Sequence, residues 1–389
     1  MSYSPRAAIA AAYFAQGCVF LSLTTRLPKF EDHWGISQLG LTLIMLMIVL
    51  LAGGGSLLSE KLAPRRGSAI VLRAGLLGIV VALVISGNAP NIPVLIAGLA
   101  IYGVCLGMVD ATTNMQAVSL EHQLRRTVLP SFHGAWTAGG IAGTLITLAL
   151  PHASIALLSS GLAVIPLVVG FARFLPGSGA APDPATAQGI PWRPILLVGA
   201  ACVIFYTVDT ASTTWGSVYF DHTLDAPHGL VALATLPYLV ASLGARVLGD
   251  RLTDRLGATR LLGSGAAIAI VGLVVVVAAP SWPVGIVGFL VLGAGIAVVA
   301  PLSYSAAATL ARGGGDLDPD TARARTDAVI ARFNQFNYVG ALVGSVLTGA
   351  IGTGSLRIGY AVPVVLLLAL FPLAKVFDRS RLAAAATAG

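Results

Sequence analysis

Two acidic residues stand inside stretches of the sequence that are otherwise apolar. Asp110 lies within "LAIYGVCLGMVDATTNMQAVSL", and Asn114 follows it by four residues, so the two share one face of a helix. A charged side chain at the centre of a membrane costs about 2.5–3.5 kcal/mol on insertion scales. A carboxyl group shielded from water can load and release a proton near neutral pH. Asp110 is therefore predicted to bind a proton or a substrate. The alternative is an Asp that neighbouring Ser, Thr or Tyr side chains satisfy.

A histidine opens the next apolar stretch, "SFHGAWTAGGIAG", residues 131–143. If this stretch and the preceding one pack antiparallel, His133 and Asp110 lie within one to two helical turns in depth. A histidine beside a carboxylate can relay protons. The alternative is a histidine that caps the start of its helix. Trp136 is a candidate for the wall of a substrate cavity, and the glycines allow close helix contact.

The second buried acid lies in "FYTVDTASTTWGSVYF", residues 205–220. Thr and Ser residues follow Asp209 and are expected to satisfy it or to line a polar cavity, so Asp209 is a second candidate for proton coupling. Trp215 and Tyr219 are one helical turn apart. They are expected either to stack on a sugar ring, to form an outer gate or to belong to the aromatic belt of a membrane interface.

A third polar stretch is "ARFNQFNYVGALVG", residues 331–344, where Asn334 and Asn337 are candidate substrate ligands. Arg332 is predicted to counter a carboxylate or to bind an anionic substrate; the alternative is that it extends to the nearby aqueous face. Two weaker candidates for the substrate cavity lie elsewhere in the chain: Gln16 and Tyr304.

The composition sets these residues in a membrane. The 389-residue chain is 56% hydrophobic and 10% charged, with a mean hydropathy of +0.87, whereas soluble domains carry about 25% charged residues. Since about 20 apolar residues cross a bilayer, and since backbone groups in lipid must bond within their own segment, the chain is predicted to be an all-α integral membrane protein without a soluble domain. Twelve apolar segments are expected to span: 7–25, 38–58, 68–87, 92–118, 129–150, 154–173, 194–219, 229–250, 259–279, 283–310, 327–352 and 357–376.

The distribution of Lys and Arg predicts the orientation of these spans. With a cytoplasmic N-terminus, nearly all basic residues fall on the cytoplasmic side, and the outer loops hold only Arg26, Lys29 and Arg357. Both termini are therefore predicted to be cytoplasmic, in a bacterial-type cytoplasmic (inner) membrane. The formal charge of +7 is a topology signal rather than a nucleic-acid footprint, because the basic residues are scattered over separate loops.

A Pro-, Gly- and Ala-rich stretch, "LPGSGAAPDPATAQGIPWRP", divides six spans from six. The predicted organisation is an N-terminal bundle at 1–174, a cytoplasmic linker at 175–193, a C-terminal bundle at 194–378 and a tail at 379–389. An internal repeat supports it, since "GSLLSEKLAPRR" after the second span matches "GDRLTDRLGATR" after the eighth.

These two segments resemble the loop signature of the major facilitator superfamily: a Gly, an acidic–basic pair, a Gly and a basic cluster. The first copy has Glu60 for the usual Asp and Ala63 for the usual Gly. The resemblance implies two six-helix bundles, related by a pseudo-two-fold axis around a central cavity, that rock to alternate access. The acid–base pairs are predicted to bias that equilibrium, and the alternative is that they only mark topology. The predicted gating residues are Gly55, Glu60, Lys61, Arg65, Gly249, Asp254, Arg255 and Arg260.

The spacing Asp110-x-x-x-Asn114 also resembles the fourth span of the fucose–galactose–glucose proton symporter branch, with Asp where that branch usually has Glu. The resemblance implies that both residues line a sugar and proton route. Drug–proton antiporters of the superfamily usually carry a Gly-Pro motif in the fifth span. The fifth span here has glycines without that motif, which disfavours a drug exporter.

The predicted function is therefore secondary active transport of a small, polar, sugar-like solute by proton-coupled alternating access. Proton-driven efflux of drugs or metabolites is the alternative, and a non-transporting sensor or an enzyme is a distant one. No nucleotide-binding loop, His-Glu-x-x-His motif or convincing nucleophile–base set occurs.

The expected partners are a small-molecule substrate, protons and the lipid bilayer, without nucleic acid or cofactor, for a monomeric protein. The three cysteines are expected to act as small hydrophobes: Cys18, Cys105 and Cys202.

Overall fold

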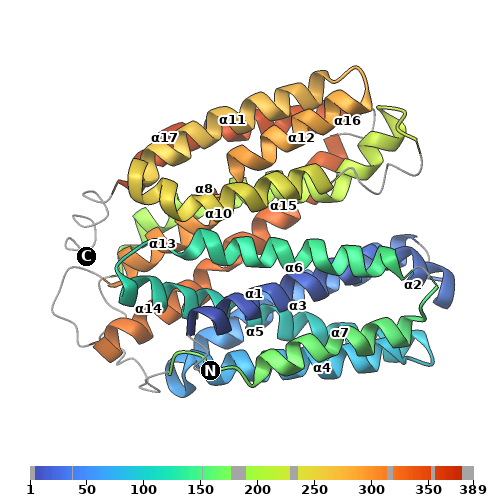
Figure 1. Ribbon diagram of the computed structural model, residues 1–389, viewed down its shortest axis with the longest axis horizontal. Coiled ribbons are helices and arrows are strands. Elements are labelled where there is room, and N and C mark those ends of the chain that lie inside the picture. The colour runs from blue at the N-terminus through green and yellow to red at the C-terminus, as the bar shows by residue number, and fades with distance from the viewer. Residues whose placement is uncertain are drawn as a thin grey trace. The chain divides into compact units, whose positions relative to one another are not determined.

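The computed structural model describes residues 5–36, 38–150, 152–176, 190–227, 235–312, 319–351 and 355–378, and every regular element in these ranges is helical (Figure 1). Most of the predicted linker and the whole predicted tail lie outside the described residues. The helices are α1 (Pro5–Thr25), α2 (Leu27–Trp34), α3 (Gln38–Arg66), α4 (Ser68–Gly87), α5 (Ile92–Leu124), α6 (Leu129–Ala149), α7 (Ile155–Gly170), α8 (Trp192–His222), α10 (Leu236–Leu256), α11 (Ala258–Ala278), α12 (Trp282–Ile296), α13 (Val299–Arg312), α14 (Pro319–Phe333), α15 (Gln335–Ile351), α16 (Leu356–Leu368) and α17 (Leu370–Ala374).

Each of the twelve predicted spans is occupied by helix. Within the described ranges, eight helical segments are long and apolar enough to cross a membrane: α1, α3, α4, α5, α8, α11, the α12–α13 pair and the α16–α17 segment. The four remaining predicted spans correspond to α6, α7, α10 and α15. The predicted all-helical membrane fold is confirmed.

Two helices run further than their apolar segments. α3 continues to Arg66 and α10 to Leu256, although hydropathy placed the ends of these spans near residues 58 and 250. Hydropathy marks where hydrocarbon ends, whereas a helix goes on until its backbone is interrupted. The interruption is a glycine in each case: Gly67 has φ +83° and Gly257 has φ +77°, conformations that glycine adopts without strain.

The chain folds into two compact units. Unit 1 comprises residues 1–124, 135–188 and 317–335, and unit 2 comprises residues 125–134, 189–316 and 336–389. Each unit therefore includes a short segment from the other half of the sequence. The predicted division at the 175–193 linker stays a prediction.

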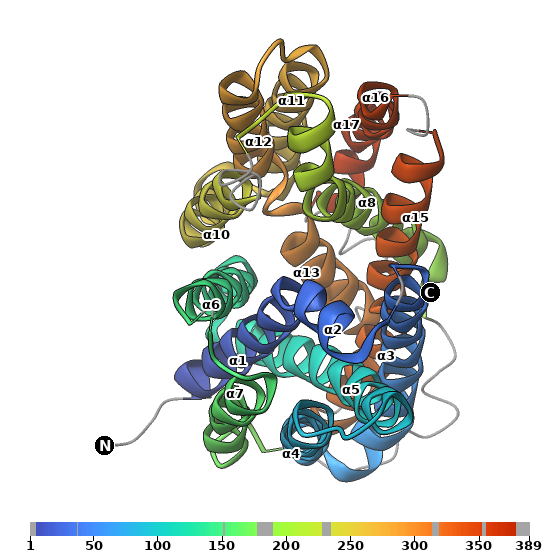
Figure 2. The ribbon, with the colours of Figure 1, turned by 90° about the vertical axis from the view of Figure 1, so that its right-hand side faces the viewer.

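Unit 1 is built around α5. This helix packs along α3 and α4, α4 packs on α7, and α14 packs on α3 and α5 (Figure 2). α1 contacts the part of α6 that belongs to this unit. A Cβ atom at Gly139 would overlap the carbonyl oxygen of Phe14, and one at Gly143 would overlap that of Cys18, so only glycine permits this approach. The close helix contact predicted for the glycine-rich fifth span is confirmed.

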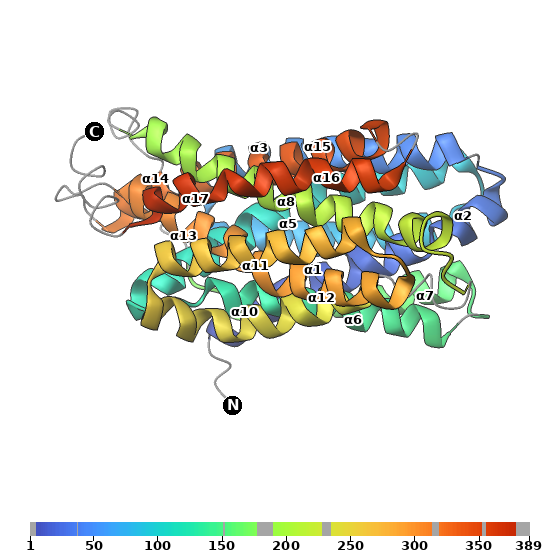
Figure 3. The same ribbon diagram turned by 90° about the horizontal axis from the view of Figure 1, so that it is seen from above.

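Unit 2 repeats this arrangement. α12 packs along α10 and α11, α11 packs on α16 and α17, and α13 packs on α8 (Figure 3). Glycine contacts show which residues of the two units correspond. Gly103 lies against the carbonyl of Ile48 in unit 1, and Gly293 lies against that of Tyr238 in unit 2, with both pairs displaced by the same number of residues.

This correspondence also aligns the two copies of the loop signature. The contacts of Gly103 and Gly293, and the terminal glycines of α3 and α10, all match at a displacement of 190 residues. Glu60 therefore corresponds in structure to Asp250. The repeat read from the sequence had matched it to Asp254, one helical turn further on.

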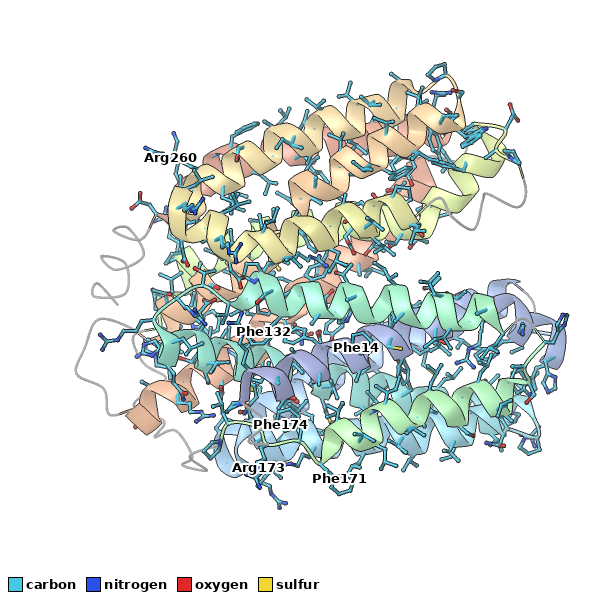
Figure 4. All side chains as sticks on the ribbon, in the orientation of Figure 1. Phe14, Phe132, Phe171, Arg173, Phe174 and Arg260 are labelled. Carbon is cyan, nitrogen blue, oxygen red and sulfur yellow. The ribbon has the colours of Figure 1, made fainter. Side chains whose placement is uncertain are left out.

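The outward surfaces of both units carry the side chains expected in lipid. Phe171, just after α7, is 78% exposed and projects away from unit 1 (Figure 4). The charged Arg260 projects away from unit 2 at the start of α11, where the helix follows a predicted loop. Exposed Leu, Ile and Val side chains recur along α3, α4, α7, α11 and α16. An apolar surface of this extent is that of a membrane protein rather than of a soluble one.

Candidate functional site

The carboxylate of Asp110 joins two other elements of unit 1. Gln16 on α1 donates from Nε2 to Asp110 Oδ1 at 3.1 Å, and Asn334 donates from Nδ2 to Asp110 Oδ2 at 2.7 Å. Asn334 is buried and lies between the end of α14 and the start of α15. The predicted candidates Gln16, Asp110 and Asn334 therefore come together, although they lie far apart in the sequence.

Tyr13 and Asn114 extend this group. Tyr13 donates its hydroxyl to Asn114 Oδ1 at 2.7 Å, and Asn114 Nδ2 donates to the backbone carbonyl of Asp110 at 2.8 Å. Gln16 Oε1 is buried without a hydrogen-bond partner among the described residues. We call these five residues the Asp110 cluster: Tyr13, Gln16, Asp110, Asn114 and Asn334.

The two amide bonds to Asp110 depend on the protonation state of its carboxyl group. Each carboxylate oxygen accepts an N–H donor, which suits the ionised form. A proton on either oxygen makes that oxygen an O–H donor and a poorer acceptor, so the amide bond that it accepts is weakened. The arrangement can therefore convert proton binding at Asp110 into release of α1 or of the α14–α15 junction.

The end of α14 and the first residue of α15 are bonded to α3. Ser56 Oγ donates to the carbonyl of Ala331 at 2.8 Å, Gln335 Nε2 donates to the carbonyl of Gly53 at 3.2 Å, and Arg332 forms an ion pair with Glu60. Arg332 thus lies beside an acid of α3, and its role in binding substrate stays a prediction. We call these three interactions the α3–α14 contact.

The other predicted gating residues fall into two groups. Gly55 and Gly249 act as packing positions, because a Cβ atom would overlap the Val104 carbonyl at the first and would meet the Pro130 ring at 2.7 Å at the second. The charged members are exposed, and no ion pair joins them to another residue of the described ranges: Lys61, Arg65, Asp254, Arg255 and Arg260.

In unit 2, Asp209 on α8 accepts a 2.6 Å hydrogen bond from the hydroxyl of Tyr238 on α10. Arg246 on α10 is buried and close enough to interact with the charge of Asp209. The hydroxyls of Ser212 and Thr213, expected to satisfy Asp209, donate to carbonyls of their own helix instead. The partner of this acid therefore comes from a neighbouring helix.

His133 lies in the same unit as Arg246. The ring centroids of His133 and Tyr304 are 6.0 Å apart, and a Cβ at Gly134 would lie 3.4 Å from Arg246 Cβ. Tyr304 is thus brought beside His133 in unit 2, whereas the Asp110 cluster belongs to unit 1. A relay between His133 and Asp110 stays a prediction.

The predicted aromatic and amide candidates outside these groups are partly buried. Trp136 on α6 packs near Phe20, with ring centroids 6.4 Å apart. Trp215 on α8 and Asn337 on α15 are each partly accessible to solvent. Substrate binding by these three residues remains a prediction.

Sequence reasoning missed three members of these groups. Tyr13 lies three residues before Gln16 and shares its helix face, and that spacing could have found it. Arg246 is a cation within an apolar segment, which is also a signal. Tyr238 gave none, because a tyrosine in an apolar segment is ordinary.

No family model matches the chain. An uncharacterised MFS-type transporter of Yersinia pestis is 24% identical over 95% of this chain and 94% of its own length. An uncharacterised transporter of Sinorhizobium fredii is 24% identical over 78% of this chain and 82% of its own.

Solved structures share the fold over almost the whole chain. The major facilitator superfamily transporter FucP in the outward conformation matches with a TM-score of 0.75 and 15% identity, covering 96% of this chain and 99% of its own. The proton:xylose symporter XylE matches with a TM-score of 0.73 and 13% identity, covering 93% and 94%.

The chain therefore has the fold of solved major facilitator superfamily transporters, as the repeated loop signature predicted, and it is similar in sequence to uncharacterised transporters.

Proposed function

We propose that the chain moves a small, polar, sugar-like solute across a bacterial cytoplasmic membrane in symport with protons, with both termini cytoplasmic. The observation that carries the proposal is the Asp110 carboxylate, which accepts one amide hydrogen bond from α1 and one from the α14–α15 junction. Hydrogen bonds to a charged group contribute about 1.5–3 kcal/mol each. Exchanging one of them for a proton is enough to shift a two-state equilibrium.

The Asp110 cluster also supports a polar ligand. It combines a carboxylate with amide and phenol groups, and Gln16 Oε1 is a buried acceptor without a donor among the described residues. Sugar hydroxyls supply such donors. FucP and XylE, which share the fold, are described as fucose:proton and proton:xylose symporters.

The α3–α14 contact is the proposed gate. It lies on the same stretch of chain as Asn334, so the loss of the Asn334–Asp110 bond loosens the segment that Glu60 and Ser56 hold. Protonation of Asp110, with solute bound, would then favour opening of this contact. Deprotonation toward the more alkaline cytoplasm would close it again.

The test uses purified protein in liposomes that contain a pH-sensitive dye. A panel of sugars and, separately, of amphiphilic compounds is added outside, and proton movement is recorded with solute uptake. The proposal expects inward proton flux with one class of polar solute. Proton flux in exchange for lipophilic cargo would support efflux instead, and solute accumulation without proton movement would overturn the coupling.

A further inference from the structure

The largest fully buried side chain of the described residues is a cation. Arg26 lies between α1 and α2 and is 1% exposed. Its Nε donates to the carbonyl of Ser22 at 3.1 Å, and its Nη1 donates to Ser159 Oγ on α7 at 3.0 Å. Its guanidinium carbon lies 5.9 Å from the centre of the Phe30 ring. None of these partners is an acid.

The guanidinium group is not fully satisfied. Nη2 of Arg26 is buried and has no hydrogen-bond partner within the described ranges. The hydroxyl of Tyr102 on α5 is likewise buried without a partner, and it lies close enough to interact electrostatically with Arg26. Two buried donors, one at the α1–α2 junction and one on α5, therefore lie near each other without an acceptor among the described residues.

The charge of Arg26 persists at neutral pH. Burial lowers the pKa of Arg26 to about 10, so the guanidinium remains protonated. An unpaired charge in a protein interior is costly unless an opposite charge compensates it. A water molecule would accept both hydrogen bonds but would leave the charge uncompensated, whereas a small anion does both.

We propose that unit 1 holds a small inorganic anion between Nη2 of Arg26 and the hydroxyl of Tyr102, with chloride as the probe. The burial of both groups favours a monatomic ion over an organic carboxylate. Tyr102 lies eight residues before Asp110 on α5, about 12 Å away along the helix. The ion is therefore separate from the Asp110 cluster, and it joins the α1–α2 junction to α5 and α7.

The first test is bromide in place of chloride. In crystals of the full-length protein grown with bromide, the proposal expects an anomalous difference peak between Arg26 and Tyr102. In detergent solution, chloride should raise the unfolding temperature saturably relative to gluconate at equal ionic strength, as a ligand of the folded state does. A water in place of the peak, or equal unfolding temperatures in the two salts, would overturn the proposal.

Variants separate this site from general salt effects. Tyr102→Phe removes one donor and should weaken the apparent chloride affinity about tenfold, and Arg26→Gln should abolish the chloride response. Arg73→Gln is the matched control: Arg73 donates to the Ala172 carbonyl at 3.0 Å and should leave the response unchanged. Should Arg26→Gln fail to fold, Tyr102→Phe still decides, because an unaltered chloride affinity in that variant contradicts the proposal.

Discussion

The α3–α14 contact of unit 1 has a counterpart in unit 2, where α10 meets the start of α6. Glu60 on α3 corresponds to Asp250 on α10. Glu60 pairs with Arg332, whereas Asp250 accepts a 3.0 Å hydrogen bond from the backbone nitrogen of Ser131. Both contacts thus use an acid to hold the neighbouring element.

The same displacement compares the residues deeper in each unit. Asp110 corresponds to Ala300, and Asn114 corresponds to Tyr304. The glycines of α6 that contact α1 correspond to the glycines of α15 that contact α8. This second correspondence matches His133, near the start of α6, to Asn334, just before α15. Unit 1 therefore places an acid against an amide, whereas unit 2 places an aromatic ring against an imidazole.

This difference indicates which of the two contacts depends on proton binding. A carboxyl group at position 110 gains a hydrogen-bond donor when it is protonated, whereas the alanine at position 300 has no group that can be protonated. The α3–α14 contact is thus expected to respond to protons through Asp110. The α10–α6 contact is expected to remain constant under the same conditions.

The largest effect is expected from Asp110→Asn, which removes the titratable group on which the comparison rests. Asn mimics the neutral carboxyl group, so one of the two amide bonds is permanently lost. Uphill, proton-driven accumulation should be abolished, while exchange of solute across liposomes continues. Accumulation at the wild-type level in this variant, measured with an imposed pH gradient, would contradict the account.

Asn334→Ala should have the next largest effect. It keeps the acid but removes one hydrogen bond to a charged group, of about 1.5–3 kcal/mol. Transport should remain proton-driven, with its pH dependence shifted toward higher pH because the ionised form of Asp110 loses a donor. His133→Ala is the corresponding change in unit 2 and should leave that pH profile in place. A profile that His133→Ala flattens would support the histidine relay instead.

Tyr13→Phe sharpens the comparison inside unit 1. The variant loses the hydroxyl that positions Asn114 and should cost about 1 kcal/mol, or about fivefold in solute affinity. Equilibrium binding of the transported solute measures this. Tyr360→Phe is the control, since its hydroxyl donates to the Ala211 carbonyl in unit 2. Equal losses in the two variants would contradict the assignment of the solute to the Asp110 cluster.

The smallest effect is expected from Glu60→Gln. Arg332 is 56% exposed and Glu60 18%, so the pair contributes about 0–1 kcal/mol and is screened by salt. Turnover should change severalfold at most at low ionic strength and converge with the wild type at high ionic strength. Asp254→Asn, at an exposed position, should change nothing, and exchanging the charges of Glu60 and Arg332 should restore turnover.

The sequence predicted most of the fold because hydropathy reports each span locally. It did not predict the break between α12 and α13 or the one between α14 and α15, since both fall inside continuous apolar or mixed segments. It also misaligned the two loop signatures by one turn. The residue types of the two segments favour the alignment of Glu60 with Asp254, whereas the packing of the glycines in the structure aligns Glu60 with Asp250.

The site was predictable only residue by residue. A buried acid and buried amides are costly and therefore visible in an apolar sequence, as Asp110, Gln16 and Asn334 were. Their grouping was not visible, because Asn334 and Asp110 are 224 residues apart and Glu60 and Arg332 are 272 apart. Such contacts arise from tertiary packing, which leaves no local signal.

The central claim is that protonation of Asp110 loosens the α3–α14 contact, and a distance measurement tests it most directly. Spin labels at Lys61 and Ala322 report this contact, and labels at Arg251 and Arg126 report the counterpart in unit 2. Acidification should lengthen the first distance in the wild type, while Asp110→Asn keeps it long at every pH and the second distance stays constant. A first distance that still follows pH in Asp110→Asn would contradict the claim.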